Sequence, residues 1–182
     1  MRLTHWVLMG GTALLLSGAL FAIQQGTRFP GERQATTSLM LDMEEGDELI
    51  LSYNTIQFGP QFAATLASAP EEQWPQLAGW VLQRLNAKLV SDVALMVGDT
   101  RLEAGTYGLT FLPNKEAGVT IQFLSGQASA AEAPLKMNKD GEEFKFLSLN
   151  LRSAGSDDVV LSMDYGTLKG RLDLSVVEDE EE

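Results

Sequence analysis

The sequence predicts a mostly β fold, an antiparallel β-sandwich or jelly-roll-like barrel with one short helical insertion. Three observations predict it. Many short segments alternate apolar and polar side chains, turn residues separate these segments at regular intervals, and only one segment has helical spacing. With 45% hydrophobic residues in 182, the chain has enough apolar side chains to build a core. We expect one folded domain over residues 38–177.

The first strands are predicted on either side of an acidic turn. Residues 38–43 place Leu39, Leu41 and Met43 on one face, and residues 48–53 form the second strand after the turn at 44–47. The alternation then stops between residues 57 and 87. Within this insertion the region 62–67 offers a helical turn or two, and 68–71 has the spacing of a capping box.

One helix is predicted over residues 75–85. Pro75 suits a first helical turn, and four apolar residues fall on one face of the helix, namely Leu77, Trp80, Val81 and Leu85. We expect this face to pack on the edge of a sheet or on one end of the sandwich.

The second half of the chain is predicted to be β throughout. Residues 89–97 form one strand, or two with a bend near Asp92, and 98–101 form a turn. Alternation then defines five further strands. The first two contain Tyr107, Leu109 and Phe111, and Val119, Ile121 and Phe123. The third contains Phe144, Phe146, Leu149 and Leu151, and the last two are 159–165 and 168–177, the latter with Leu172, Leu174 and Val176. A phase change near Ser148 indicates a bulge. Loops are expected at 114–118 and 125–133, and a tight hairpin turn at 166–167.

The two ends of the chain are predicted to lie outside this domain. Residues 1–23 have a basic start, an apolar run and small residues, as in a signal peptide, with cleavage expected after Ala19 or Ala22. The run is nearly long enough to span a bilayer, so an uncleaved membrane anchor is the alternative. Residues 24–37 read as a linker and 178–182 as an acidic disordered tail. We therefore expect an exported protein, in the periplasm or at the cell surface, whose membrane contact is limited to this N-terminal segment if it is uncleaved.

Composition excludes several kinds of chemistry. The net charge of −12 disfavours binding to nucleic acid. The chain has no cysteine and one histidine, His5, which lies in the N-terminal segment. Thiol catalysis, Ser-His-Asp catalysis and ordinary zinc sites are therefore excluded from the domain.

The most distinctive stretch is 97–109, with Ala104-Gly105-Thr106-Tyr107 followed by Phe111 and Pro113. It resembles the bacterial domain of unknown function 2911 family, and the likeness continues through Val119-Thr120-Ile121-Gln122-Phe123, Leu51-Ser52-Tyr53 and the region from Trp80 to Asn86. The chain departs from the family pattern at Val81, at Arg84-Leu85, at Gly118 and around 54–58. The resemblance implies a divergent member with an exported β-sandwich of unassigned biochemistry.

Five residues are candidates for ligand contact. Tyr53, Trp74 and Trp80 could form an aromatic platform for a sugar or peptide, although helical spacing also fits Trp80 in the core. The resemblance adds Asn86 and Tyr107. The structural interpretation of Tyr107 is a ring packed inside with its hydroxyl bonded at the edge.

Carboxylates are the remaining chemical groups. Asp42, Glu44, Glu45 and Asp47 crowd one turn and could hold calcium, although they lack the spacing of an EF-hand loop; no other cofactor is expected. A second set, Asp157, Asp158 and Asp164, flanks one predicted strand, and a pair of carboxylates from either set could serve glycoside hydrolysis. For both sets a solvated turn or hairpin is the simpler interpretation.

The leading hypothesis is an exported, non-catalytic binding or interaction domain for a glycan, peptide or protein. We expect it to use the end of the sandwich that carries the insertion at 57–86. A carboxylate-based glycan hydrolase and a calcium-stabilised structural module are the alternatives.

Overall fold

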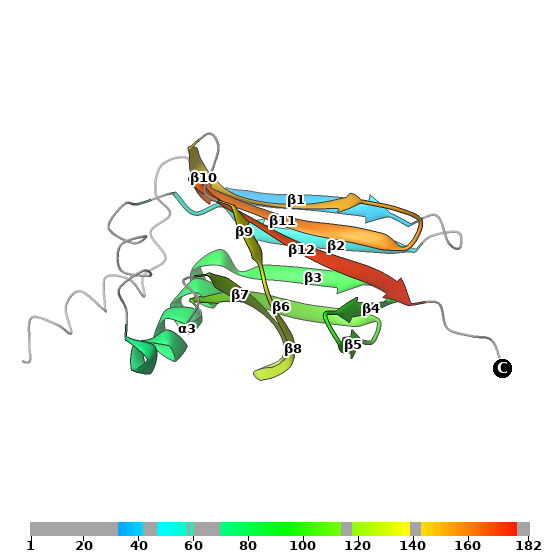
Figure 1. The fold of residues 1–182 in the computed structure, drawn as a ribbon, viewed down its shortest axis with the longest axis horizontal. Coiled ribbons are helices and arrows are strands. Elements are labelled where there is room, and N and C mark those ends of the chain that lie inside the picture. The colour runs from blue at the N-terminus through cyan, green and yellow to red at the C-terminus, as the bar shows by residue number, and fades with distance from the viewer. Residues whose placement is uncertain are drawn as a thin grey trace, which may run out of the picture. The chain divides into compact units, whose positions relative to one another are not determined.

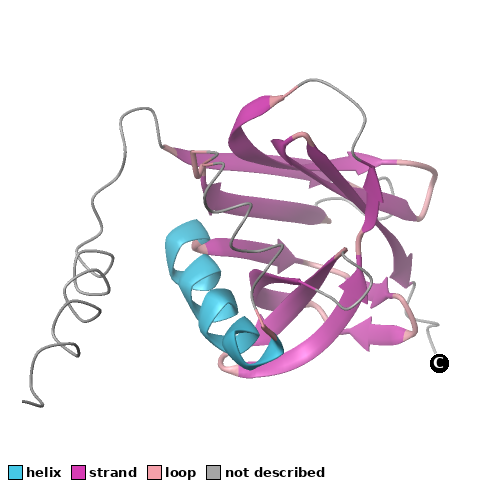
Figure 2. Ribbon diagram, turned by 60° about the vertical axis from the view of Figure 1, so that its left-hand side comes forward, coloured by secondary structure: helices cyan, strands magenta, loops and turns pink. Residues whose placement is uncertain are grey.

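In the described part of the computed structural model, two antiparallel β-sheets face each other and one α-helix lies outside one of them (Figures 1 and 2). The structure describes residues 33–41, 47–57, 59, 70–113, 118–138 and 143–177. All of them belong to one unit of the chain, Gly31–Glu182. The predicted β-sandwich with a short helical insertion is confirmed. The predicted N-terminal segment 1–23 and acidic tail 178–182 lie outside the described residues.

The first sheet, called the β1 sheet, has the strand order β1-β2-β3-β6-β7-β8. Its neighbouring strands are all antiparallel. The strands are β1 (Gln34–Met40), β2 (Glu48–Asn54), β3 (Ala87–Ser91), β6 (Gly105–Pro113), β7 (Val119–Ser125) and β8 (Ala128–Pro134).

The second sheet, called the β10 sheet, has the order β10-β11-β12-β4-β5, with β9 also paired to β12. Strand β9 lies beside the first half of β12 and β4 beside its last four residues. The strands are β4 (Ala94–Val97), β5 (Thr100–Leu102), β9 (Lys136–Asn138), β10 (Phe144–Ser153), β11 (Asp158–Gly166) and β12 (Leu168–Val177).

The chain passes from one sheet to the other through very short connections. Residues 92–93 link β3 to β4, so the predicted bend near Asp92 separates two strands that belong to different sheets. The Ser91 hydroxyl donates to the carbonyl of Val93 at 2.5 Å within this bend. Leu135 alone separates β8 from β9, which pair with β7 and β12 respectively. These corners hold the two sheets against each other.

Three hairpins depend on a glycine at the first of two turn residues. Tyr165 pairs with Leu168, so the β11–β12 turn is Gly166-Thr167, and Gly166 has φ of 60°. A positive φ at that position is a feature of type II′ turns and favours glycine. The predicted hairpin turn at 166–167 is therefore confirmed. Gly98 and Gly126 take the same role in the β4–β5 and β7–β8 turns.

Several predicted boundaries need correction. The predicted loop 125–133 is wrong, because residues 128–134 form β8 and bury Ala131 and Ala133 against the core. The predicted turn 98–101 is shorter, since Thr100 and Arg101 belong to β5. Strand β1 begins at Gln34, so the last four residues of the predicted linker 24–37 are paired with β2. Many of these residues are small and polar and give a weak strand signal in the sequence. Pairing with a neighbouring strand is what makes them part of the sheet.

The bulge predicted near Ser148 is confirmed. Between the pairs Phe144–Gly166 and Ser148–Asp164, β10 advances four residues while β11 advances two. Within this irregular stretch β10 meets the chain that follows β2. Gln57 and Phe146 form a bridge, and the Leu147 N–H donates to the carbonyl of Ile56 at 2.8 Å. At the bulge, β10 thus bonds to the chain that follows β2, in addition to its pairing with β11.

The helix α3 (Trp74–Leu85) follows a short 3-10 turn, η1 (Glu71–Gln73), and matches the predicted 75–85 closely. Pro75 lies in its first turn, where the missing N–H costs no hydrogen bond. The first residues of the predicted capping box lie outside the described residues, and Pro70 precedes η1 without a side-chain cap. The helical turns suggested for 62–67 also lie outside them.

The helix packs on the outer face of the β1 sheet rather than on its edge or on the sandwich end, as Figure 2 shows. In β6, Tyr107, Leu109 and Phe111 face the core, so the intervening residues face outward. The buried hydroxyl of Thr110 donates to the Ala78 carbonyl at 2.8 Å. The predicted position of the helix was therefore wrong. The outward side chains of β6 are small or polar, which lets the helix pack closely against this face of the sheet.

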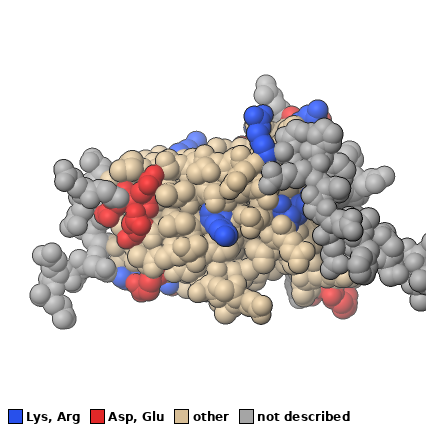
Figure 3. Space-filling model, turned by 180° about the vertical axis from the view of Figure 1, so that it is seen from behind, with Lys and Arg blue, Asp and Glu red and all other residues tan. Residues whose placement is uncertain are grey.

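Charged side chains are unevenly spread over the surface of the molecule (Figure 3). The side of the molecule seen in Figure 3 is broadly uncharged, with isolated basic groups and acidic groups gathered towards its ends. On the β1 sheet, outward residues of neighbouring strands lie side by side and form rows across the sheet. One such row is Thr36, Ser52, Lys88, Gly108 and Leu124.

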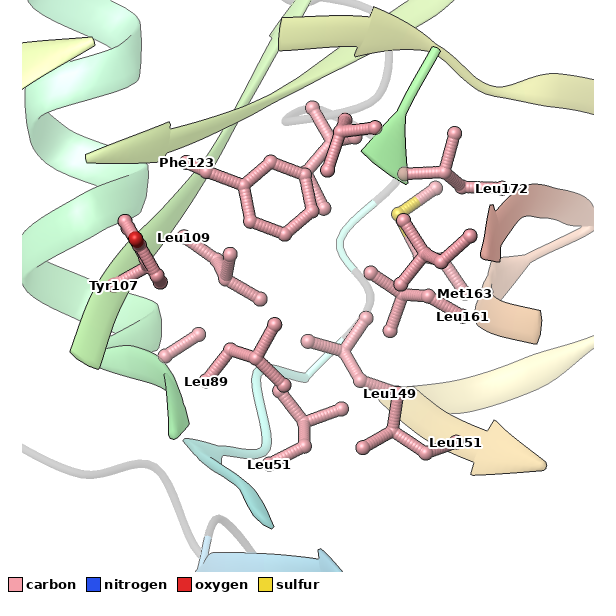
Figure 4. Close-up of a cluster of buried hydrophobic side chains, with 14 of the residues drawn as sticks. Leu51, Leu89, Tyr107, Leu109, Phe123, Leu149, Leu151, Leu161, Met163 and Leu172 are labelled. Carbon is pink, nitrogen blue, oxygen red and sulfur yellow. The ribbon is translucent and has the colours of Figure 1, made fainter. Parts of the chain in front are cut away.

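The core lies between the two sheets, as Figure 4 shows. Leu51, Leu89, Tyr107, Leu109 and Phe123 come from the β1 sheet, and Leu149, Leu151, Leu161, Met163 and Leu172 from the β10 sheet. Every one of these side chains is at most 8% exposed. The predicted core alternation in the second half of the chain is confirmed.

Two glycines test this packing in opposite directions. A Cβ on Gly170 would lie 2.8 Å from Leu135 Cδ1 and 3.3 Å from Met137 Sδ, whereas a Cβ on Gly79, in α3, meets nothing within 4 Å. We expect Gly170→Ala to lower the free energy of unfolding by about 1–3 kcal/mol through overpacking. Gly79→Ala should raise it by about 0.5–1 kcal/mol through helix propensity. Urea unfolding of both variants measures this, and equal effects would contradict the packing described.

Candidate functional site

A groove of about 400 Å³ lies on the outer face of the β1 sheet, beside the C-terminal end of α3. Residues of α3, β3, β6 and β7 and of the β7–β8 turn surround it. The lining consists of Leu82, Gln83, Asn86, Ala87, Lys88, Thr106, Gly108, Leu124 and Gly126. The groove therefore lies where the insertion predicted at 57–86 rejoins the sheet.

Strand register brings these lining residues together. Ala87 and Leu89 face the core, so Lys88 between them points outward. Lys88 pairs with Gly108, and Gly108 pairs with Leu124. A Cβ on Gly108 would lie 3.7 Å from Leu82 Cδ1 and 3.8 Å from Leu124 Cβ. The missing side chain thus leaves the floor of the groove open between two leucines.

The lining combines apolar, amide and hydroxyl groups with one charge. Leu82 and Leu124 are half-buried, whereas Gln83, Lys88 and Thr106 are exposed. Among the described residues that line the groove, Lys88 alone carries a charge. A groove with this lining can hold an apolar segment by contact area and a polar group by hydrogen bonds. Its single cation favours a ligand with a negative group at that point.

The candidate Asn86 lies in the groove lining, and it also ends the helix. Its backbone has φ of 44° and ψ of 41°, the left-handed conformation, and its N–H donates to the Leu82 carbonyl at 2.9 Å. Asparagine tolerates this conformation better than most residues and is common after a helix C-terminus. Asn86 therefore has a structural role as the cap of α3, and its exposed side chain remains available to a ligand.

The three residues of the predicted aromatic platform have different environments. Tyr53 is 5% exposed and belongs to the core. Trp80 is half-buried and packs against that core, as its helical spacing allowed. Trp74 is the first residue of α3 and is also half-buried. Because Tyr53 is buried, the structure does not bring all three rings to one exposed surface.

The candidate Tyr107 has the environment of its structural interpretation, with the ring packed inside and the hydroxyl hydrogen-bonded. Its ring is 8% exposed, and its hydroxyl donates to the Glu103 carbonyl at 2.7 Å. This bond ties the start of β6 to the backbone four residues earlier, as in the tyrosine corner of other β-sandwiches. The neighbouring Thr106 points the other way and lines the groove.

Of the acids proposed for glycoside hydrolysis, Asp164 lies far from the other two. Asp158 and Asp164 are the first and seventh residues of β11, about 20 Å apart along an extended strand. Glycosidase carboxyl pairs are about 5–9.5 Å apart. Asp157 and Asp158 are exposed, and the Ser175 hydroxyl donates to Asp158 at 3.2 Å. Within the described residues, the only buried polar side chains are Ser91 and Thr110.

Most of the candidate calcium ligands lie outside the described residues. These are Asp42, Glu44 and Glu45, whereas Asp47 is half-buried and its carbonyl accepts from the Leu41 N–H at 3.0 Å. The described ranges contain no group of three or more acids or histidines arranged to hold a metal ion. The calcium site at this turn stays a prediction.

Charge on the outer face of the β10 sheet is organised into ion pairs. Hydrogen bonds from Lys136, then from Arg171, hold the pKa of Asp173 below its usual value. All three side chains are largely exposed, so solvent screens the pairs and they contribute little to stability. Here two basic side chains bond one carboxylate, whereas the described residues that line the groove include no acid beside Lys88.

The fold and groove together define an antiparallel β-sandwich that carries a helix-bordered groove on one outer face. No family model, curated protein or solved structure matches this chain. In the part of the chain that the structure describes, no helix is both long enough and apolar enough to cross a membrane.

Sequence reasoning did not find most of the groove. Among its lining residues only Asn86 was singled out, and Lys88, Gln83 and Leu124 were missed. The alternation of apolar and polar residues did indicate part of the groove, because it places Lys88 and Thr106 on the face of the sheet opposite the core. The row that joins β3, β6 and β7 depends on register between distant strands, which alternation alone does not specify.

The Tyr107 hydroxyl bond is open to a direct test. We expect Tyr107→Phe to lower the free energy of unfolding by about 1 kcal/mol, because the Glu103 carbonyl loses its partner. Tyr53→Phe is the matched control, since the described part of the chain shows no hydrogen bond from that hydroxyl. Denaturant unfolding of both variants is the measurement. Equal effects in the two variants would contradict a specific role for the bond.

The calcium prediction has its own measurement. If the turn at 42–47 holds calcium, excess calcium at about 100 times its dissociation constant adds about 2.7 kcal/mol to stability, and a chelator removes that gain. Thermal melting of the full chain with calcium and with chelator checks this. Asp42→Asn with Glu44→Gln should remove the difference, and an unchanged midpoint in the unsubstituted chain ends the idea.

Proposed function

We propose that this chain is a non-catalytic binding domain, exported to the periplasm or cell surface, that holds its ligand in the groove beside the end of α3. The observation that carries the proposal is the groove lining, whose described residues combine two leucines, two amides, a hydroxyl and Lys88. Such a mixture suits recognition by contact area together with a few oriented polar groups.

Binding explains this lining better than catalysis does. Acid–base chemistry requires a positioned pair of titratable groups, and the described residues that line the groove include no carboxylate, imidazole or thiol. The separation of Asp158 and Asp164 also weighs against the glycan hydrolase. Lys88 then acts as an anchor for a charged group of the ligand.

The ligand class that fits is a glycan, a peptide or a protein segment with a carboxylate or another acidic group. The groove is open along the sheet surface and has apolar contacts from Leu82 and Leu124 on either side of Gly108. Nucleic acid remains disfavoured, because a net charge of −12 repels a phosphate backbone.

The resemblance to the domain of unknown function 2911 family agrees with this proposal. The stretch that carries the likeness, Ala104-Gly105-Thr106-Tyr107, begins β6. It supplies a structural tyrosine on the inner face and the groove residue Thr106 on the outer face. A family motif at this point would therefore serve both the fold and the groove.

A glycan and peptide array probed with the full chain in mild detergent tests the proposal. We expect hits enriched in acidic ligands, and we expect Lys88→Glu to weaken them about tenfold to a hundredfold, because a charged hydrogen bond becomes a repulsion. Arg152→Glu is the matched control, since it makes the same charge change on the exposed surface of β10.

The outcomes separate clearly. Binding that falls in Lys88→Glu and persists in Arg152→Glu supports the groove. Equal losses would indicate that overall charge controls the interaction. An array without hits, or hits unaffected by Lys88→Glu, would overturn the groove as the contact surface.

A further inference from the structure

We propose that two copies of this chain associate through strand β1, which pairs antiparallel with itself across a twofold axis and joins the two β1 sheets into one. Strand β1 is the edge of its sheet, because β2 lies on one side of it and no described strand pairs with the other side. This inference concerns the opposite end of the sheet order from the β7–β8 side of the groove, and it does not rest on the proposed function.

Four residues of β1 have backbone N–H and carbonyl groups that point to its unpaired edge. Thr55 N–H donates to the Arg33 carbonyl at 2.8 Å, and Leu41 N–H donates to the Asp47 carbonyl at 3.0 Å. Odd-numbered residues of β1 therefore bond to β2, because bonding alternates along an antiparallel pair. The N–H and carbonyl groups of Gln34, Thr36, Ser38 and Met40 consequently point away from the sheet.

The other edge strands carry features that discourage pairing, and β1 does not. Strand β8 has Glu132, Pro134 and a register shift, and β10 has Lys145, Arg152 and a bulge. Strand β5 is only three residues long. Charge, proline, bulges and short length are the usual protections of an edge.

Strand β1 has seven residues without a charge or a proline, and its register with β2 is unbroken. Its last residue, Met40, is 63% exposed and is the exposed large hydrophobic side chain among the described residues. A regular edge of this kind is a template for another strand.

A second copy fits this edge in one register. With Thr37 opposite Thr37 of its partner, Gln34 pairs with Met40 and Thr36 pairs with Ser38, in both directions. The four residues whose backbone groups point to the free edge then all form hydrogen-bonded pairs with the partner, which gives about eight backbone hydrogen bonds.

The side chains match in the same register. Leu39 lies beside the partner's Ala35 on the inner face, and Met40 lies beside the partner's Gln34 on the outer face. No like charges are opposed, so two chains of net charge −12 meet at their uncharged strands. The geometry thus points to an isologous dimer with a self-complementary patch.

A single cysteine reports the twofold axis directly, because the chain has none of its own. Thr37 would form a non-hydrogen-bonded pair with itself, with Cα atoms about 4.5 Å apart, which suits a disulfide. We expect Thr37→Cys to form a disulfide-linked dimer under mild oxidation of the full chain in detergent. Ser129→Cys, at an exposed position on edge strand β8, should remain largely monomeric.

A pair of charge variants tests the same register without a cross-link. Thr36 and Ser38 are exposed, so both variants should keep the monomer fold, which circular dichroism verifies. T36K/S38K places lysines opposite lysines and should weaken dimerisation about tenfold. T36K/S38E places a lysine opposite a glutamate and should restore it. Analytical ultracentrifugation of the full chain in detergent measures both.

Each result decides the proposal. Cross-linking at residue 37 together with the opposite responses of the two charge variants supports it. A dimer equally stable in both variants arises from another surface, such as the apolar N-terminal stretch, and overturns it. A chain that is monomeric at all concentrations also overturns it. The candidate partner of β1 would then be an extended segment of another protein.

Discussion

The structure depends on the requirement that every second side chain of β6 be buried between the two sheets. Tyr107, Leu109 and Phe111 point inward, so Thr106, Gly108 and Thr110 must point outward. The inward row meets Leu161 and Leu149 of the facing sheet across the core. The outward row bonds α3 through Thr110 and leaves room for the groove at Gly108. One strand therefore positions the core, the helix and the candidate site.

The parts of the fold that the sequence predicted are those with strong local patterns. The alternation of Leu172, Leu174 and Val176 and the phase change at Ser148 both reflect burial within a single strand. Strand β8 was missed because alanine and serine give little contrast between inner and outer positions. Strands β5 and β9 have three residues each, too few for any alternation to be visible.

The candidate site was less predictable than the fold, for a physical reason. Asn86 was named as a candidate through the family resemblance, and the structure places it at the C-terminal end of α3. Lys88 and Leu124 are 36 residues apart and share a row only through the registers of β3, β6 and β7. Register is set by the packing of the whole sheet, and a shift of one residue would send Lys88 to the core.

The distribution of charge links the groove to the exposed edge of the same sheet. The chain has 25 acidic residues against 13 basic ones, yet Glu48 and Lys88 are the only charged residues among the outward positions of β1, β2 and β3. A net charge far from zero keeps a protein soluble at some cost in self-repulsion. A surface spared from that charge can approach another molecule without the repulsion. The β1 sheet is therefore the part of this acidic domain best suited to contact, with an apolar and amide-lined groove near one side and unpaired backbone groups along the other.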